Sequence, residues 1–443
     1  MALISKPSFI HTRLQNFVAG MLFPAGSSDW YRMKKYGLNT TNEPAMSPCN
    51  DFCYQQKNNP KAYYYKEFEN LDIGVSMVSS QLSNGEFCKL EKFVCSPEKA
   101  NPDLPGNGKH IIYFPGADTY YQACFRDIST AARETGATIH AFNFPGTGLS
   151  TGKVREANDL TNAGIAMVKS LLAQGIHPDD IVLQGDCFGA AIAMEVKEQL
   201  AKQANVDMRI VMNNSFKSFK AAVQDMITST TWLPARLKDI VKALLQFTGW
   251  HITPGKKFVH SGPYQCHIKH DGDLVLPSGT LSDKVRRMRS SEKNKYKDNC
   301  PEEYKEVRNT LERGHILQVK EDAKERLGKK FGRDKYGRIN AHFADLCELE
   351  TQDGKPAYAG FVNQFLNASN EYIEAHPQNV NPEETAKKLQ FINEAPSHSI
   401  TKEEADEIQK FQELMDNFHE HDAKYGADSS HDVTSFWHCQ LNF

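Results

Sequence analysis

Between residues 108 and 213, short apolar runs alternate with stretches that carry apolar residues at helical spacing. The runs predict strands over 110–114, 138–144, 180–184 and 209–213, and the stretches between them predict helices over 120–135, 157–175 and 188–203. Another strand is expected over 264–268, and Ile316–Val319 is a candidate for the last core strand. This alternation is typical of a mostly parallel sheet covered by helices, so the predicted fold class is α/β.

An antiparallel hairpin is expected before this region. The segments 73–80 and 87–95 flank Ser83-Asn84-Gly85, a strong turn signal. The N-terminal 1–70 is predicted to be a helical or irregular addition. Within it, apolar residues between 10 and 22 share one helical face, which favours packing on the core over an interfacial membrane anchor.

The second half of the chain contains one basic segment and one acidic segment. Residues 281–338 hold 18 Lys and Arg against 11 Asp and Glu, and residues 401–428 hold nine acids against three bases. We therefore expect a core over 71–375 with a charged helical insertion at about 281–340, and an acidic helical extension over 376–443. The alternative for the insertion is a surface for phosphate or anionic lipid.

Composition narrows the possible classes of protein. The chain has 443 residues, a net charge of −3 and ten cysteines without the spacing of a disulfide scaffold. Bulk charge gives no support for nucleic-acid binding. No stretch has transmembrane length, and no secretory signal peptide is expected. The cysteine spacing therefore predicts free thiols in a reducing compartment. Cys49 and Cys53 lack a second pair of ligands at the spacing of a zinc site, so no metal is predicted.

The candidate chemistry lies where the strand 180–184 meets the helix 188–203. The junction reads Gly185-Asp-Cys-Phe-Gly189, which is the G-x-S-x-G nucleophile elbow with cysteine in place of serine. Such a turn lifts one side chain above the sheet, and the flanking glycines let strand and helix approach closely. Cys187 is the candidate nucleophile, and a buried structural cysteine is the alternative.

A cysteine nucleophile needs a base and an orienting carboxylate, in the chain order nucleophile, acid, histidine. Asp273 follows the strand 264–268 and is preferred to Asp271, because of the turn at Gly272 and the spacing to Pro277. His342 follows the candidate last strand after a charged loop and precedes a helix-like run. His431 is the alternative base.

Further residues are expected around this triad. The backbone N–H groups of Phe188 and Ala117 are the candidate oxyanion donors, since Pro115 has no N–H. The apolar segment 219–250 is a candidate cap, with Trp232 and Leu237 lining an acyl pocket; plain core packing is the alternative.

Phe114-Pro-Gly-Ala, Asn143-Phe-Pro-Gly-Thr-Gly-Leu-Ser-Thr-Gly152, the elbow and Asn213-Asn-Ser-Phe216 resemble the α/β-hydrolase superfamily. More narrowly, they are similar to the SidB-like lipase and esterase effectors that intracellular bacteria inject into host cells. The resemblance covers about 73–370 and implies a Cys–His–Asp triad at Cys187, His342 and Asp273. Serine stands at the elbow of many relatives, and the long charged stretch before His342 is a departure from their pattern.

The sequence thus predicts an α/β-hydrolase that acts on an ester or thioester by acyl transfer and needs no cofactor. A lipid substrate and a peripheral membrane contact are left open. The expected location is the cytoplasm or, after injection, a host cell. The alternatives are a catalytically inactive hydrolase-fold binding module and a cysteine protease or acyltransferase on the same fold.

Overall fold

The computed structural model describes residues 66–117, 119–223, 248–258, 265–273, 315–331 and 337–393, together with 15, 19, 245, 275, 280, 281 and 333. A nine-stranded sheet runs through this part of the chain in the order β1-β2-β4-β3-β5-β6-β7-β8-β9. The strands are β1 (Leu71–Gln81), β2 (Phe87–Pro97), β3 (His110–Phe114), β4 (Thr138–Phe142), β5 (Ile181–Asp186), β6 (Arg209–Asn213), β7 (Gln265–His270), β8 (His315–Val319) and β9 (Leu349–Glu350).

The pairing confirms a mostly parallel sheet with an antiparallel hairpin at one edge. Strands β4, β3, β5, β6, β7 and β8 are parallel to their neighbours, while β1 pairs antiparallel with β2 and β2 with β4. The short β9 closes the other edge in the antiparallel direction. This strand order, with a βα elbow after β5, is the α/β-hydrolase fold.

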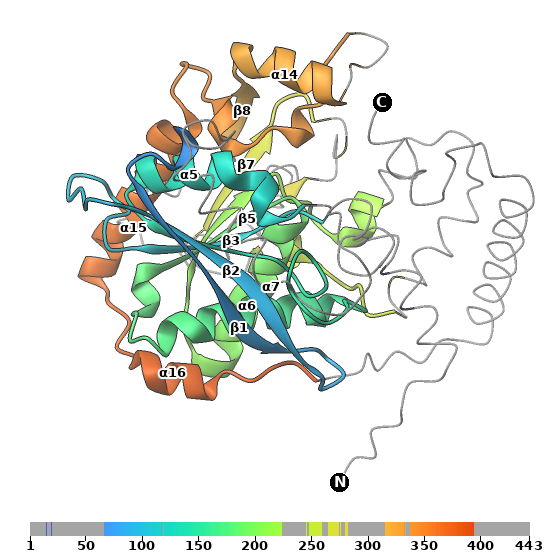
Figure 1. The fold of residues 1–443 in the computed structure, drawn as a ribbon, viewed down its shortest axis with the longest axis vertical. Coiled ribbons are helices and arrows are strands. Elements are labelled where there is room, and N and C mark those ends of the chain that lie inside the picture. The colour runs from blue at the N-terminus through green and yellow to red at the C-terminus, as the bar shows by residue number, and fades with distance from the viewer. Residues whose placement is uncertain are drawn as a thin grey trace, which may run out of the picture.

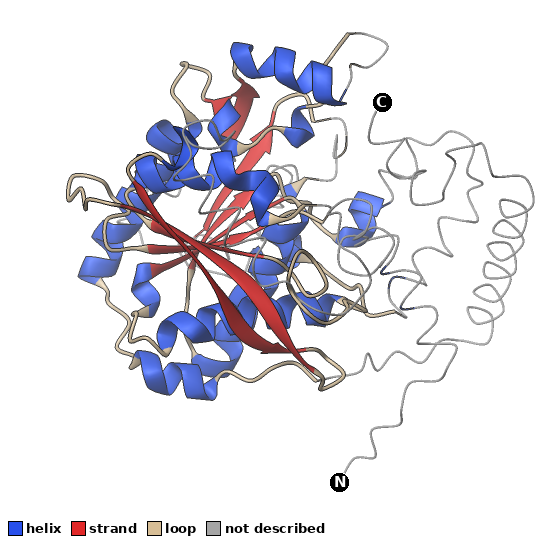
Figure 2. Cartoon of the chain, in the orientation of Figure 1, coloured by secondary structure: helices blue, strands red, loops and turns tan. Residues whose placement is uncertain are grey.

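Helices cover both faces of the sheet (Figures 1 and 2). One face packs on α6 (Ala157–Leu172), α7 (Phe188–Ala204) and α16 (Pro382–Lys388), and the other on α5 (Phe125–Thr135), α14 (Glu321–Phe331) and α15 (Asn363–Ala375). The short α10 (Pro254–Phe258) lies beside α7. The two cores follow from strand periodicity, because successive side chains point to opposite faces of the sheet: Ile112 and Phe114 lie in one core, Ile111 and Tyr113 in the other.

The apolar runs located the central elements closely. Strands 110–114 and 209–213 have the predicted bounds, whereas β4 ends at Phe142, two residues early, and a short 3-10 helix over Tyr121–Cys124 precedes α5. One expectation on the C-terminal side differs. Residues after His342 form 3-10 turns and β9 before a π-helical turn at Tyr358–Val362 leads into α15. Residues that follow 375 pack on the core, with Leu389 buried against it.

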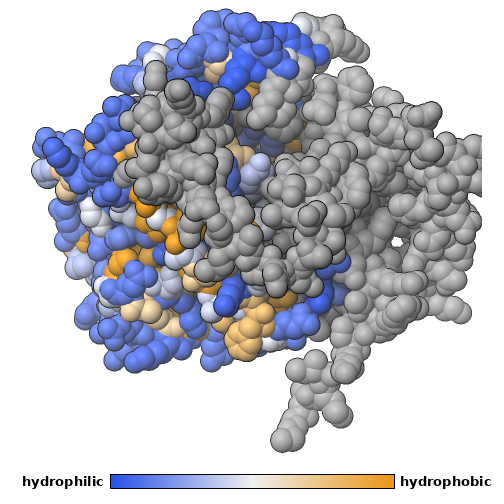
Figure 3. Space-filling view, in the orientation of Figure 1, coloured by the Kyte–Doolittle hydropathy of each residue, from blue (hydrophilic) through white to orange (hydrophobic). Residues whose placement is uncertain are grey.

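Several predictions fall outside the described residues. They concern the N-terminal amphipathic stretch apart from Gln15 and Ala19, most of the candidate cap, the charged segment 282–314 and the acidic segment 401–428. The division of the chain into three parts therefore stays a prediction. Figure 3 shows the described surface as mostly hydrophilic, with hydrophobic residues on the face that carries the β1–β2 hairpin.

Candidate functional site

The elbow is built by close approach of strand and helix. Cys187 stands between β5 and α7 with φ +48° and ψ −106°, a conformation that costs an L-residue about 1–3 kcal/mol. A Cβ at Gly189 would lie 2.2 Å from the Phe114 carbonyl oxygen, and one at Gly185 would lie 2.5 Å from the Ala190 nitrogen. Only glycine therefore fits at both flanking positions, which is what the motif predicts.

The backbone of Cys187 is hydrogen-bonded to a neighbouring strand, and the residue is partly exposed. The Cys187 N–H donates to the carbonyl oxygen of Asn213 at the end of β6, at 2.8 Å. Of the six cysteines that the structure describes, five are buried and Cys187 alone is partly exposed.

The structure brings Asp273 and His342 together beside the elbow. Asp273 comes three residues after β7, and its Oδ2 accepts a hydrogen bond from Nδ1 of His342 at 3.0 Å. The same carboxylate accepts from the Val275 N–H and from Nδ2 of Asn214, each at 2.7 Å. These donors fix the orientation of the carboxylate. Asp271, the rival acid, is exposed.

The charge on His342 is favoured by its neighbours. Burial lowers its pKa, but the charges of Asp273 and Cys187 and hydrogen bonds to both outweigh burial and raise the pKa well above its usual value. Because Asp273 occupies Nδ1, the thiol interacts with Nε2. His431 lies outside the described residues.

The predicted oxyanion donors flank the same position. Phe188 is the first residue of α7, so its N–H points out of the helix N-terminus. Ala117 follows β3, and both Ala117 and Cys187 pack against the core on the α7 side of the sheet. The oxyanion role of their N–H groups stays a prediction.

An aromatic cluster that the sequence did not single out packs behind the elbow. The Phe188 ring contacts those of Phe219, Trp250 and Phe216 at centroid distances of 5.3, 6.1 and 6.2 Å. Trp250, a candidate cap residue, is 1% exposed and belongs to the core. Trp232 and Leu237 lie outside the described residues, so their place in an acyl pocket stays a prediction.

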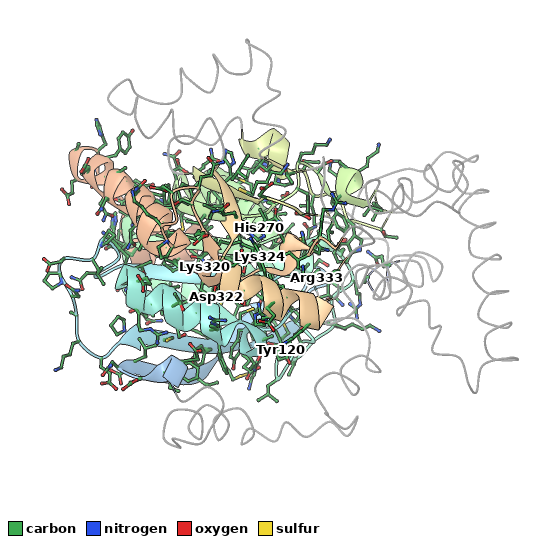
Figure 4. The ribbon with its side chains drawn as sticks, turned by 90° about the horizontal axis from the view of Figure 1, so that it is seen from above. Tyr120, His270, Lys320, Asp322, Lys324 and Arg333 are labelled. Atoms are coloured by element: carbon green, nitrogen blue, oxygen red, sulfur yellow. The ribbon has the colours of Figure 1, made fainter. Side chains whose placement is uncertain are left out.

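A buried polar network under the elbow also escaped sequence reasoning. The carboxyl of Asp186, next to the nucleophile, accepts from the Tyr113 hydroxyl and, at 2.9 Å, from the side-chain amide of Asn213. His270 links this pair to the base, because its Nε2 lies 2.8 Å from the Asn213 amide and its Nδ1 lies 2.7 Å from the carbonyl oxygen of Ala341. Figure 4 places His270 inside the body, whereas Lys320, Asp322, Lys324 and Arg333 lie on or beside α14.

Donor and acceptor matching fixes the tautomer of His270. A carbonyl oxygen only accepts, so Nδ1 of His270 carries its proton. Burial lowers the pKa of His270 to about 4, so the ring is neutral at pH 7. Burial raises the pKa of Asp186, and the hydrogen bonds from Tyr113 and Asn213 only partly offset this effect.

The described residues contain no group of three or more His, Cys, Asp or Glu side chains that could hold a metal ion. None of the helices described is both long and apolar enough to cross a membrane.

Comparisons with known proteins found one family model and several solved structures that are similar to parts of this chain. Residues 337–401, which include His342, match the family described as SdbC, C-terminal domain. No curated protein matches the chain. An esterase from Pyrococcus furiosus is 19% identical, with 52% of this chain and 80% of that one covered and a TM-score of 0.37. A carboxyl esterase from the fungus Tuber melanosporum is 13% identical, covering 72% and 87%, with a TM-score of 0.38. The α/β-hydrolase fold of the chain follows from its strand order and elbow, and residues 337–401 resemble the SdbC C-terminal domain.

Proposed function

We propose that the chain is an enzyme that hydrolyses an ester or thioester by acyl transfer through Cys187, His342 and Asp273. One observation carries the proposal: a partly exposed cysteine in a strained strand-to-helix turn interacts with a buried histidine whose other ring nitrogen is held by a buried carboxylate. Strain of this kind persists at functional sites. A structural cysteine needs neither the strain nor the histidine.

The steps follow from these contacts. The Cys187 sulfur attacks the acyl carbon, a C–S bond forms, and the carbonyl electron pair moves to the oxygen, which the N–H groups of Phe188 and Ala117 stabilise. When the intermediate collapses, the bond to the alcohol or thiol breaks and His342 gives its proton to the leaving group. His342 then takes a proton from a water whose oxygen attacks the acyl carbon. The C–S bond breaks, the carboxylic acid leaves, and His342 returns the proton to the Cys187 sulfur. Asp273 keeps Nε2 facing the reaction throughout.

The surroundings of the elbow support an acyl substrate. Phe188, Phe216 and Phe219 form a buried apolar cluster behind the elbow, and we propose that an acyl chain extends this apolar region, at about 0.8 kcal/mol per buried CH2. We extend the proposal to lipid esters, a peripheral membrane contact and an effector role, in line with the SidB-like resemblance. A cysteine nucleophile also fits the reducing compartment expected for ten unscaffolded cysteines.

The test is turnover of p-nitrophenyl esters and acyl thioesters of several chain lengths. Cys187→Ala and His342→Ala should abolish turnover while both variants remain folded at the assay temperature. The matched control is His376→Ala, because His376 is an exposed histidine at the end of α15. His431→Ala should also keep activity.

Other outcomes separate the alternatives. Wild-type turnover by Cys187→Ala would eliminate the proposed nucleophile. A wild-type protein that turns over neither esters nor thioesters would favour the inactive binding module, and cleavage of peptides in preference to esters would favour the protease.

A further inference from the structure

A groove lies away from the elbow, on the α6 side of the hairpin. It is an open groove of about 820 Å³ between β1, α6, α16 and the segment that follows α16. Figure 1 shows α16 next to α6, with the β1–β2 hairpin running across them. The residues that matter for its chemistry are Ser76, Val78, Lys92, Lys169, Lys387 and Phe391.

Lys92 is the unusual member of this lining. It lies inside β2 and the residue as a whole is only 6% exposed, yet no described residue makes a hydrogen bond or ion pair with its ammonium group. Burial of the side chain lowers the pKa of Lys92. Lys92 also lines the open groove, so its ammonium group is available there to an anionic ligand.

The surroundings of Lys92 hold other positive charge and few acids. Burial and then the charge of Lys92 lower the pKa of His140 to about 2, so this neighbour is neutral. Lys169 and Lys387 also line the groove, against Glu383 as its acidic residue. Lys169 donates to the Leu389 carbonyl oxygen at 2.6 Å, and burial lowers its pKa as well. The groove is therefore suited to a negatively charged group.

Ser76 completes a place for that group. The register pairs Ser76 directly opposite Lys92, so their Cβ atoms are about 5 Å apart. Ser76 is exposed and lines the groove, so its hydroxyl can donate to the same anion. One ammonium and one hydroxyl side by side match the two oxygens of a carboxylate.

The rest of the groove is too large for a simple ion and is partly apolar. Val78 packs on the core from β1, and the Phe391 ring lies 5.2 Å from the Lys169 ammonium. We propose that this groove binds a carboxylate that carries an aliphatic chain, with Lys92 and Ser76 holding the carboxylate and the apolar wall holding the chain. The site is independent of Cys187 and of the reaction proposed for it.

Titration calorimetry with sodium decanoate below its micelle concentration tests the site. The wild type should bind in a saturable way, Lys92→Met should bind at least tenfold more weakly, and Lys89→Met should bind as the wild type does. Lys89 is the matched control, because it is an exposed lysine of the same strand that lies outside the groove. Inorganic phosphate, which lacks the chain, should not displace decanoate.

A second variant does not alter the buried lysine. Ser76→Asp places a carboxylate opposite Lys92, so the protein should lose at least tenfold in decanoate affinity and unfold at a higher temperature than the wild type. The proposal is overturned if the wild type shows no saturable binding, if Lys92→Met and Lys89→Met bind equally well, or if Ser76→Asp leaves the affinity unchanged. Displacement of decanoate by phosphate alone would contradict the aliphatic part of the ligand.

Discussion

The strain at Cys187 gives a prediction about stability that does not depend on the substrate. Cys187→Ala and Cys187→Gly both remove the sulfur, but only the glycine adopts φ +48° and ψ −106° without a Cβ clash. Relief of that strain favours Gly by about 1–3 kcal/mol. The greater freedom of an unfolded glycine opposes this by about 0.5–1 kcal/mol. The glycine variant should therefore be about 1 kcal/mol more stable than the alanine variant.

Urea unfolding of the two variants measures this difference directly, as a shift of the transition midpoint at constant slope. The control is Ala201→Gly, at an exposed position of α7, where glycine should cost about 1 kcal/mol relative to alanine. Replacing alanine by glycine should thus raise the free energy of unfolding at position 187 and lower it at position 201. If glycine at 187 is destabilising by as much as it is at 201, the reasoning about a strained elbow is refuted.

Three more predictions concern the site. Gly189→Ala should cost at least about 2 kcal/mol in the free energy of unfolding, because its Cβ would lie 2.2 Å from a backbone carbonyl oxygen. Gly74→Ala is the control and should be tolerated, because no atom lies within 4 Å of its new Cβ. Equal melting temperatures of the two variants would contradict this prediction. Asp186→Ala should cost about 1–3 kcal/mol in the free energy of unfolding, because it leaves the buried donors of Tyr113 and Asn213 unpaired; a melting temperature equal to that of the wild type would contradict this. Because the pKa of His342 is raised in the folded state, its stabilising interaction is complete below the unfolded-state pKa of about 6.5 and is lost as pH rises through the folded-state pKa. The difference in the free energy of unfolding between the wild type and His342→Gln should therefore shrink as pH rises. Urea titrations at several pH values measure it, and a difference that grows with pH would contradict this reasoning.

Local pattern was enough to locate the sheet and the elbow. Strands 110–114 and 209–213 are continuous apolar runs bounded by polar residues, and a strand buried on both faces leaves this signature. The elbow was visible because its glycines are required by close backbone contacts, that of Gly185 with the start of α7 and that of Gly189 with the end of β3. Residue order along the chain also sufficed to place Asp273 and His342 as candidates, and the structure brings them into contact.

The remaining features depend on contacts between distant segments. The network of Tyr113, Asp186, Asn213 and His270 forms only when the ends of four strands meet, and no local pattern marks it. The residues after His342 were expected to be helical from their apolar spacing. Instead, the structure starts a 3-10 turn there, with the Asn340 side chain accepting from the His342 N–H at 3.1 Å. Hydrogen bonds from such a capping side chain compete with helix formation, and the spacing of apolar residues does not reveal them.

The most direct test of the central claim is to trap the acyl-enzyme. The wild type is mixed with p-nitrophenyl butyrate, quenched in acid within the first turnover, and analysed by intact-mass and peptide-mapping spectrometry. We expect one butyryl group per chain, attached to Cys187, and none on the Cys187→Ala protein. A butyryl group on another residue, or ester turnover by the wild type that persists undiminished in Cys187→Ala, would contradict the account.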